Sequence, residues 1–242
     1  MVVSSGIQSV SEHIENSYVI YDAQLKGQVS VQWFEPDYWQ NRAEIQRVGT
    51  GRGEAWFIHC ELGDFVLRHY RRGGLMARVT TDRYVWIGLH KTRAWREYQL
   101  LVKLQELGLP APAPLAARVC RYGGFYTADL MTRRIADSQS LSTILSRQAL
   151  DNRQWQQIGR CIRRFHNHDI CHADLNAHNI LLDQSGRVYL IDFDKSDVDQ
   201  DSSWQSRTLQ RLQRSLLKLQ AQLPDFHYRE ADWQALMAGY DA

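Results

Sequence analysis

The spacing of hydrophobic positions changes along this chain of 242 residues. From Ile45 to Arg68, short apolar runs are separated by glycine-containing turns, which is the pattern of strands joined into an antiparallel β-meander. Before them, Val29 to Phe34 alternates like one short strand, and the polar remainder of residues 1–45 predicts a partly ordered lead-in. The first part of the chain is therefore expected to be mainly β-structure.

Helical spacing begins at Thr92, which can cap a helix that ends at Gly108 and the prolines after it. Within this helix Glu97 shares a stripe with apolar residues, so this acid requires a cationic partner. Phe125 to Met131 predicts one more strand.

The second half of the chain is expected to be mainly helical. Asp151 and Gln154 form a capping box at the start of a helix with a broad apolar face. Two short strands, Ile180–Leu182 and Val188–Ile191, flank a turn and predict a hairpin that ends at Asp192.

Composition narrows the class of protein. Hydrophobic residues make up 44% and aromatic residues 11%, as in globular proteins. The length allows one larger domain or two lobes that share an active site. A formal net charge of +2 indicates no nucleic-acid partner, and the four cysteines form no CxxC pair that would predict a disulfide framework or a thiolate zinc site. We also expect neither a signal peptide nor a membrane-spanning segment.

The clearest chemical signal is His-Ala-Asp-Leu-Asn-Ala-His-Asn at residues 172–179, followed by the hairpin and Ile-Asp-Phe-Asp. It resembles the catalytic loop and metal-binding motif of kinases, with Asn179 five positions after Asp174 and with Asp192 after the hairpin. The resemblance implies that Asp174 orients and deprotonates an acceptor hydroxyl. It implies that Asn179 and Asp192 are ligands of Mg²⁺ at the phosphates of ATP, and that His172 braces the loop.

Two other interpretations apply to the same segment. Taken singly, Asp174, Asn176 and Asn179 are ordinary turn formers, and only their joint spacing favours the kinase interpretation. Zinc is a rival because histidines and a cysteine crowd together, but their spacings match no zinc signature. These residues are His166, His168, Cys171, His172 and His178.

A glycine run between two predicted strands lies where a kinase has its glycine-rich loop. Gly49, Gly51 and Gly53 are therefore candidates for contacts with the phosphates of ATP, although the third glycine comes one residue early. In the kinase pattern the next strand carries a Lys that pairs with a helix Glu. Arg68 stands at that position and Glu97 is the candidate acid. The alternative is that Arg68 is a surface residue and Glu97 a solvated acid.

The stretch Arg-His-Tyr-Arg-Arg-Gly-Gly-Leu from Arg68, the 172–183 segment and the Ile-Asp-Phe-Asp ending resemble the 3-deoxy-D-manno-octulosonic acid (Kdo) kinases of the lipopolysaccharide kinase group. The resemblance covers residues 45 to 200. It implies a single α+β domain of bilobal, protein-kinase-like fold after the 1–45 lead-in. An N-lobe of antiparallel β-sheet plus one helix is expected at about 46–132, and a mainly helical C-lobe at about 133–242.

The same resemblance implies ATP-dependent phosphorylation of the 4-hydroxyl of Kdo on lipid A, an anionic glycolipid. The enzyme would be peripheral to the cytoplasmic face of the inner membrane, with no obligate protein partner. Backbone groups near Met131 to Arg133 are expected to contact adenine.

Two basic segments leave alternatives open. In a helix over 203–220, leucines and cations lie on opposite sides. The cations either meet anionic lipid or are simply solvated while the leucines face the core. The second interpretation is preferred. The arginine-rich segment from Arg68 to Arg96 either contacts the lipid A phosphates and the Kdo carboxylate or is solvated surface.

Three competing functions are weighed against the Kdo kinase. A protein kinase is disfavoured because Asp-Phe-Asp replaces Asp-Phe-Gly and no Ala-Pro-Glu segment follows. Another small-molecule kinase, of the heptose, aminoglycoside or choline type, differs only in its acceptor. A pseudokinase binding module would keep the fold without turnover.

Overall fold

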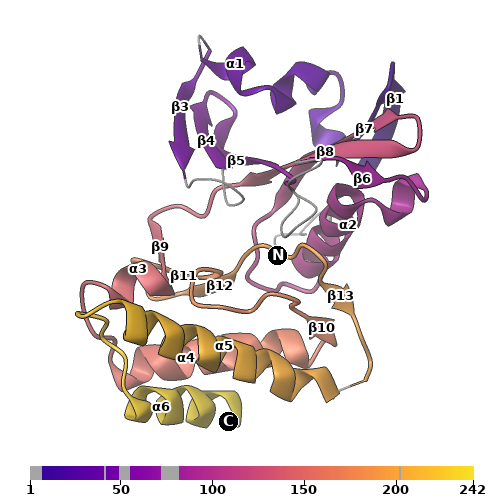
Figure 1. Cartoon of the computed structure of the whole chain (residues 1–242). Helices are drawn as coiled ribbons and strands as arrows, with labels where there is room; N and C mark the ends of the chain where they lie inside the picture. Colours follow the sequence, from indigo (N-terminus) through magenta and orange to yellow (C-terminus); the bar gives the residue numbers. More distant parts are fainter. Residues whose placement is uncertain (1–6, 41, 49–54, 72–81, 202) are drawn as a thin grey trace, which may run out of the picture. The chain divides into compact units, whose positions relative to one another are not determined.

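The computed structural model describes residues 7–40, 42–48, 55–71, 82–201 and 203–242, which divide into two compact units (Figure 1). Unit 1 comprises Met1–Leu107 and Pro112–Arg134, and unit 2 comprises Gly108–Ala111 and Ile135–Ala242. Both combine helices with antiparallel strand pairs, so the chain has the mixed α and β composition expected from its sequence.

Unit 1 is built on an antiparallel sheet with the strand order β1-β2-β7-β8-β5-β4-β3, in which β6 pairs with β8. The helix α2 (Arg93–Glu106) packs against β7 and β8 (Figure 1). The strands are β1 (Ser9–Ile14), β2 (Ser17–Asp22), β3 (Glu44–Val48), β4 (Ala55–Cys60), β5 (Gly63–His69), β6 (Tyr84–Val85), β7 (Pro114–Tyr122) and β8 (Phe125–Arg133).

The meander predicted from Ile45 to Arg68 is confirmed by β3, β4 and β5. Alternate residues such as Ile58, Phe65 and Leu67 are buried in the core of unit 1, which is the period expected for half-buried strands. Thr92 occupies the N-cap position of α2 as predicted, but its hydroxyl donates to the carbonyl oxygen of Leu89 at 2.6 Å.

The segment Val29 to Phe34 is not a strand, so that prediction was wrong. Val31–Phe34 forms a short 3-10 helix, η2, at whose start the Ser30 hydroxyl accepts a hydrogen bond from the Gln32 amide at 3.2 Å. Consecutive residues of a strand point to opposite faces, whereas Trp33 and Phe34 are both buried in one core. A helical turn places both rings on the same side.

The rest of the lead-in belongs to unit 1. Strand β2 pairs with β7, from Ser17 opposite Cys120 to Tyr21 opposite Ala116, and β1 pairs with β2. Two 3-10 helices, η1 (Ala23–Leu25) and η2, follow β2 and precede the short helix α1 (Pro36–Trp39). The indole Nε1 of Trp39 donates to the carbonyl oxygen of Trp33 at 2.8 Å.

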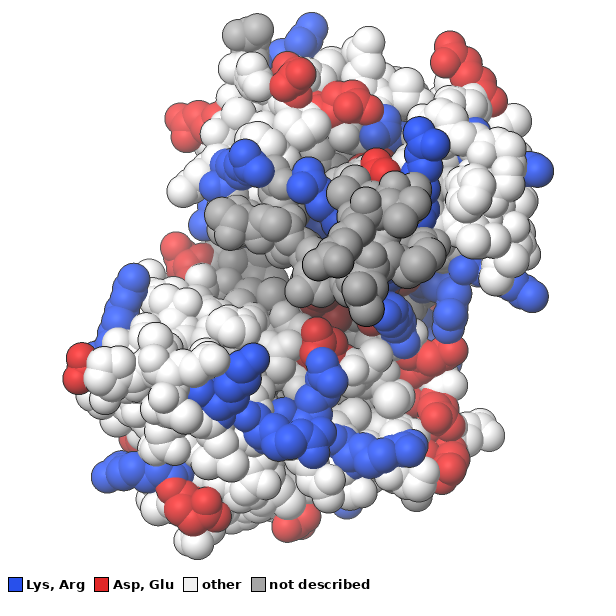
Figure 2. Space-filling model, viewed as in Figure 1, with Lys and Arg blue, Asp and Glu red and all other residues white. Residues whose placement is uncertain are grey.

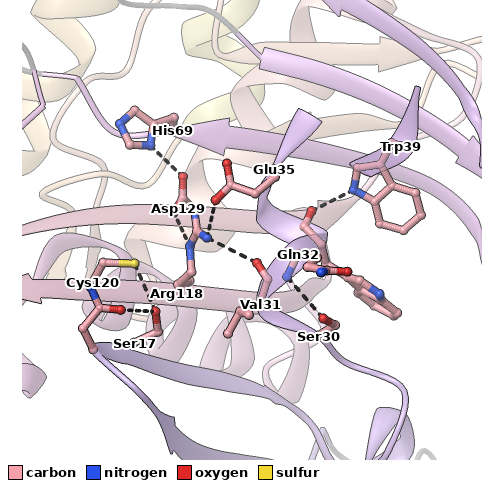
Figure 3. Close-up of polar contacts among 12 residues, drawn as sticks. Ser17, Ser30, Val31, Gln32, Glu35, Trp39, His69, Arg118, Cys120 and Asp129 are labelled. Carbon is pink, nitrogen blue, oxygen red and sulfur yellow. Dashed lines mark hydrogen bonds and ion pairs between the residues drawn. The ribbon is translucent and has the colours of Figure 1, made fainter. Parts of the chain in front are cut away.

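A polar cluster around one buried carboxylate ties η2 to the sheet (Figure 3). We call Asp129, His69, Arg118 and Glu35 the Asp129 cluster. Asp129 is 1% exposed and binds His69 Nδ1 through Oδ1 at 2.6 Å and Arg118 Nε through Oδ2 at 2.8 Å. Arg118 Nη1 donates to the Val31 carbonyl oxygen at 3.2 Å and to Glu35 Oε1 at 2.6 Å. Both oxygens of the buried carboxylate are thus satisfied.

Unit 2 contains four helices and two small sheets among its described residues. The predicted capping box is confirmed at the start of α4, because Asp151 and Gln154 exchange hydrogen bonds of 2.8 and 2.9 Å. The elements are β9 (Ser138–Ser140), α3 (Leu141–Leu145), α4 (Asn152–His166), β10 (Ile170–Cys171), β11 (Ile180–Asp183), β12 (Val188–Leu190), β13 (Asp197–Val198), α5 (Ser203–Gln222) and α6 (Glu230–Tyr240).

Helices α4 and α6 touch backbone to backbone. A Cβ atom on Gly159 would lie 2.0 Å from the carbonyl oxygen of Leu236, and one on Gly239 would lie 2.1 Å from that of Gln156. No side chain fits at either place, so this contact requires glycine on both helices.

The first part of the interpretation preferred for the basic helix, leucines that face the core, is confirmed in α5, while contact of its cations with lipid stays a prediction. Leu209, Leu212 and Leu216 are buried, while the cations are exposed. The exposed cations are Arg207, Arg211, Arg214 and Lys218. Lys and Arg side chains gather over the part of unit 2 where α5 runs (Figure 2). Among the described residues, no helix has both the length and the apolar character needed to cross a membrane.

Candidate functional site

The predicted catalytic loop lies in unit 2, between β10 and β11, and its first residue is a buried histidine. His172 is 1% exposed. Its Nδ1 accepts a hydrogen bond from the Asp174 amide at 3.2 Å, so Nε2 carries the proton and donates to the Ile191 carbonyl oxygen at 2.9 Å. Burial lowers the pKa of His172, which favours this neutral form. The imidazole therefore braces the loop against the residue that precedes Asp192.

Two asparagines hold the backbone of Asp174. The Nδ2 atoms of Asn176 and Asn179 both donate to its carbonyl oxygen, each at 2.9 Å. Asn176 Oδ1 in turn accepts from the His178 amide at 2.8 Å. Since Asn179 is only 8% exposed and its nitrogen is engaged, its Oδ1 is the atom suited to a cation.

The hairpin brings Asn179 and Asp192 to the same end of β11 and β12. Ile180 pairs with Leu190, and the Ile191 amide donates to the Asn179 carbonyl oxygen at 3.0 Å. The backbone of Asp192 has a φ of 64°, in the left-handed region that few residues other than glycine adopt. Such conformations cluster at functional sites, where the surrounding structure enforces them.

Phe193 anchors this unusual backbone. Its ring is buried, stacks on Phe165 with a centroid separation of 5.7 Å and lies 4.8 Å from the ring of His172. The Ser196 hydroxyl accepts from the Ala173 amide at 3.1 Å. The Asp192 segment and the catalytic loop are therefore packed and hydrogen-bonded to each other.

The carboxylate of Asp174 meets an arginine that the sequence analysis did not connect with it. Arg211 of α5 donates to Asp174 Oδ1 from Nε at 2.8 Å and also from Nη2. The two side chains are 50% and 45% exposed. Arg211 follows Asp174 by 37 positions, so no local sequence signal connects the two residues. The only signal from the sequence was that Arg211 belongs to the basic side of the predicted 203–220 helix.

In unit 1 the structure brings Arg68 and Glu97 together. Arg68 Nη2 lies 2.6 Å from both carboxylate oxygens of Glu97, which is 3% exposed. The alternative of a solvated acid is therefore wrong, because Glu97 is buried and paired. Tyr70 was missed: its hydroxyl donates to Glu97 Oε2, and the Arg68 guanidinium lies 5.0 Å from its ring centre. Burial, together with Glu97, raises the pKa of Tyr70 well above its ordinary value.

The remaining candidates divide by location. Asp174, Asn179 and Asp192 lie in unit 2, and Arg68 and Glu97 in unit 1. Gly49, Gly51 and Gly53 lie outside the described residues, so their assignment to the phosphates stays a prediction.

Two histidines of the zinc interpretation are hydrogen-bonded to hydroxyl groups of unit 2. His166 Nδ1 is hydrogen-bonded to the Tyr240 hydroxyl at 2.7 Å, and His178 Nδ1 to the Ser142 hydroxyl at 2.8 Å. In the part of the chain that the structure describes, no group of three or more His, Cys, Asp or Glu side chains could hold a metal ion. Asn179 offers an amide oxygen and Asp192 a carboxylate, which are donors of the kind that a hard cation takes, and their assignment as metal ligands stays a prediction.

Comparison with known proteins places these motifs in a family. Residues 36–240 match the sequence model of the lipopolysaccharide kinase (Kdo/WaaP) family. A 3-deoxy-D-manno-octulosonic acid kinase of Xylella fastidiosa is 44% identical over 225 residues, 92% of this chain and 89% of the relative. Its namesake from Photobacterium profundum is 38% identical over 227 residues, 94% of this chain and 96% of the relative.

Proposed function

The chain belongs to the lipopolysaccharide kinase (Kdo/WaaP) family, and on that premise we propose that it transfers the γ-phosphoryl group of ATP to the 4-hydroxyl of the Kdo residue of Kdo-lipid A. Family membership makes it a phosphotransferase that uses ATP and an alcohol acceptor. The proposal adds the particular sugar, its hydroxyl and the lipid that carries it.

The observation that carries the proposal is the fixed backbone of Asp174. His172, Asn176 and Asn179 all hold its peptide groups, while its carboxylate stays half-exposed. Phosphoryl transfer depends mainly on positioning and charge stabilisation, and this loop offers a rigidly placed, accessible base. Asp174 accepts the proton of the acceptor hydroxyl as the oxygen–phosphorus bond forms and the bond from the γ-phosphorus to the oxygen of the leaving ADP breaks.

Asn179 and Asp192 hold Mg²⁺ in this proposal, and their hard oxygen donors fit that ion. When bound, the metal neutralises charge on the phosphates. Arg68, oriented by Glu97 and Tyr70, binds the phosphates of ATP with the charge that a Lys supplies in other kinases. Unit 1, with its sheet and α2, is proposed as the N-lobe, and the mainly helical unit 2 as the C-lobe, of one bilobal kinase domain.

We further place the enzyme at the cytoplasmic face of the inner membrane, as a peripheral protein, because its proposed acceptor is a membrane lipid. Sedimentation with vesicles that contain Kdo-lipid A is the corresponding test. Binding that disappears when Kdo-lipid A is omitted would support acceptor-dependent recruitment.

Transfer of labelled γ-phosphate from ATP and Mg²⁺ to purified Kdo-lipid A tests the function, with a protein substrate in a parallel reaction. We expect labelling of the glycolipid alone. Asp174→Ala should abolish it, whereas Asp225→Ala, at an exposed aspartate of the same unit, should leave it unchanged. Labelling of the protein substrate instead, or glycolipid labelling that survives Asp174→Ala, would contradict the proposal.

A further inference from the structure

A cation lies against the catalytic carboxylate although the catalytic loop itself has none. Residues 172–179 contain no Lys or Arg. The guanidinium next to Asp174 comes from Arg211, in the third turn of α5. Its presence at this position needs an explanation beyond the local sequence.

The position of Arg211 is fixed by the rest of its helix. Leu212 and Leu216 are completely buried, so α5 is anchored in the core of unit 2. One turn after Arg211, the Ser215 hydroxyl accepts from the Ala177 amide of the catalytic loop at 3.3 Å. Arg211 and Ser215 thus lie on the face of α5 that follows the loop.

The contact between Arg211 and Asp174 is poorly suited to a structural role. Half-exposed ion pairs of this kind contribute about 0–1 kcal/mol to stability. Arginine binds a carboxylate best through two parallel hydrogen bonds, one to each oxygen. Here Nε and Nη2 converge on Oδ1 alone. A better-matched carboxylate can therefore displace Asp174 from the guanidinium at little cost.

The acceptor proposed above brings such a group. The relatives act, by their names, on an octulosonic acid, whose carboxyl group is ionised near neutral pH. Two carbons of the sugar separate the carboxyl carbon from the carbon that carries the 4-hydroxyl. A sugar whose 4-hydroxyl is hydrogen-bonded to Asp174 thus carries its carboxylate only a few bonds away, within reach of a residue that touches Asp174.

We propose that Arg211 binds the carboxylate of the acceptor sugar and so selects an acidic sugar for transfer at Asp174. In the free protein the guanidinium is held by Asp174, and in the complex it exchanges this partner for the acceptor, which leaves Asp174 to the hydroxyl. This inference rests on the proposed function, because it assigns the acceptor-binding contact of the same site.

The test compares Kdo-lipid A with its carboxyl methyl ester as acceptors. The wild type should use the ester with a kcat/KM about 10- to 100-fold lower, the range of a lost charge-assisted hydrogen bond. Arg211→Gln should lower kcat/KM for the acid by a similar factor and should use acid and ester alike. Arg211→Lys, which keeps the charge, should recover part of the preference. Arg214→Gln, at an exposed arginine of the same helix, should behave as the wild type.

The outcomes separate this inference from the proposed function. Equal use of acid and ester by the wild type would overturn the role of Arg211 without any variant. An equal loss for both acceptors in Arg211→Gln would also overturn it and make Arg211 a positioning residue for Asp174. Failure of the wild type to label either acceptor would instead remove the proposed function itself, and the inference with it.

Discussion

Each unit contains an arginine–aspartate pair, and the two pairs differ in burial. In unit 1 the side chains of Asp129 and Arg118 are 2% and 12% exposed, and both oxygens of the aspartate are hydrogen-bonded. In unit 2 the side chains of Asp174 and Arg211 are 45% and 50% exposed, and both arginine donors meet one oxygen. The same chemical pair is thus buried with both carboxylate oxygens hydrogen-bonded in unit 1, and half-exposed with one carboxylate oxygen bonded to the arginine in unit 2.

The difference has an energetic meaning. Removing one partner of a buried pair leaves an uncompensated charge, which costs about 3–5 kcal/mol, whereas an exposed pair contributes about 0–1 kcal/mol. Asp129 should therefore matter for stability and Asp174 for activity. Substitutions at the two pairs test this division between stability and activity.

Asp174→Asn should reduce phosphate transfer to Kdo-lipid A by about 10²- to 10⁴-fold, because the amide cannot accept the acceptor's proton. Its denaturation midpoint should stay close to that of the wild type, since only an exposed pair is lost. Steady-state kinetics and urea denaturation of the same preparation measure both. A large loss of stability would show that the pair in unit 2 is structural after all.

Asp129→Asn should lower the free energy of unfolding by about 3–5 kcal/mol, because Arg118 keeps its charge without a buried anion. Urea denaturation followed by tryptophan fluorescence measures this change. Asp225→Asn is the matched control and should be neutral. An unfolding free energy equal to that of the wild type would remove the distinction between the two pairs.

The units should also respond to pH in opposite directions, each through a histidine. The hydrogen bond to Asp129 raises the pKa of His69, whereas burial lowers the pKa of His166 from 6.5 to about 4. His69 adds stability below its unfolded pKa, and this stability is lost as the pH rises through the raised folded value. Between pH 6.5 and about 4 the imidazole of His166 is protonated in the unfolded chain but not in the folded one, so the free energy of unfolding falls as the pH is lowered.

Unfolding free energies from pH 4.5 to 8 test this, with His69→Gln and His166→Asn beside the wild type. The advantage of the wild type over His69→Gln should be largest at acidic pH. Relative to His166→Asn, the wild type should lose about 2–3 kcal/mol towards acidic pH. Parallel slopes for the two differences would contradict the assignment. His166 is hydrogen-bonded to the Tyr240 hydroxyl at 2.7 Å and to the Thr208 hydroxyl at 3.3 Å. Asparagine is chosen for the variant because its amide can retain part of this hydrogen bonding.

The smallest effect is expected at the outer end of the Asp129 cluster. Glu35 is 57% exposed where it meets Arg118, so Glu35→Gln should cost only about 0–1 kcal/mol. The measurement is the same urea denaturation. A loss of stability similar to that of Asp129→Asn would mean that the residues of the Asp129 cluster contribute cooperatively and that their burial does not determine their individual contributions.

Local signals in the sequence predicted local structure well. The capping box of α4 and the hairpin of β11 and β12 depend on residues a few positions apart, so a single stretch of sequence defines them. The pairing of β2 with β7, about a hundred residues away, has no such local signal. The adjacent buried rings of Trp33 and Phe34 were misread for a related reason, because their common core is assembled from distant strands.

The residues of the candidate site also differ in whether a local stretch of sequence predicts them. Asp174, Asn179 and Asp192 follow from motif spacing, and Glu97 follows from an acid on an apolar helix face. Arg211 is identified only from the contact of α5 with the loop at Asp174, and Tyr70 only from its hydrogen bond to Glu97 of α2. Side chains that complete a site from another element carry no motif of their own.

The glycine contact between α4 and α6 has a consequence for protein engineering. Because Gly159 and Gly239 leave no room for even a methyl group, a mutational scan of unit 2 should tolerate no other residue at these two positions. Exposed positions of the same helices, such as Arg160 and Ala231, should accept many. A fusion partner or a truncation that disturbs α6 would loosen α4, which precedes β10 and the predicted catalytic loop. Helix α6 is therefore unsuitable as an attachment point for tags or reporters.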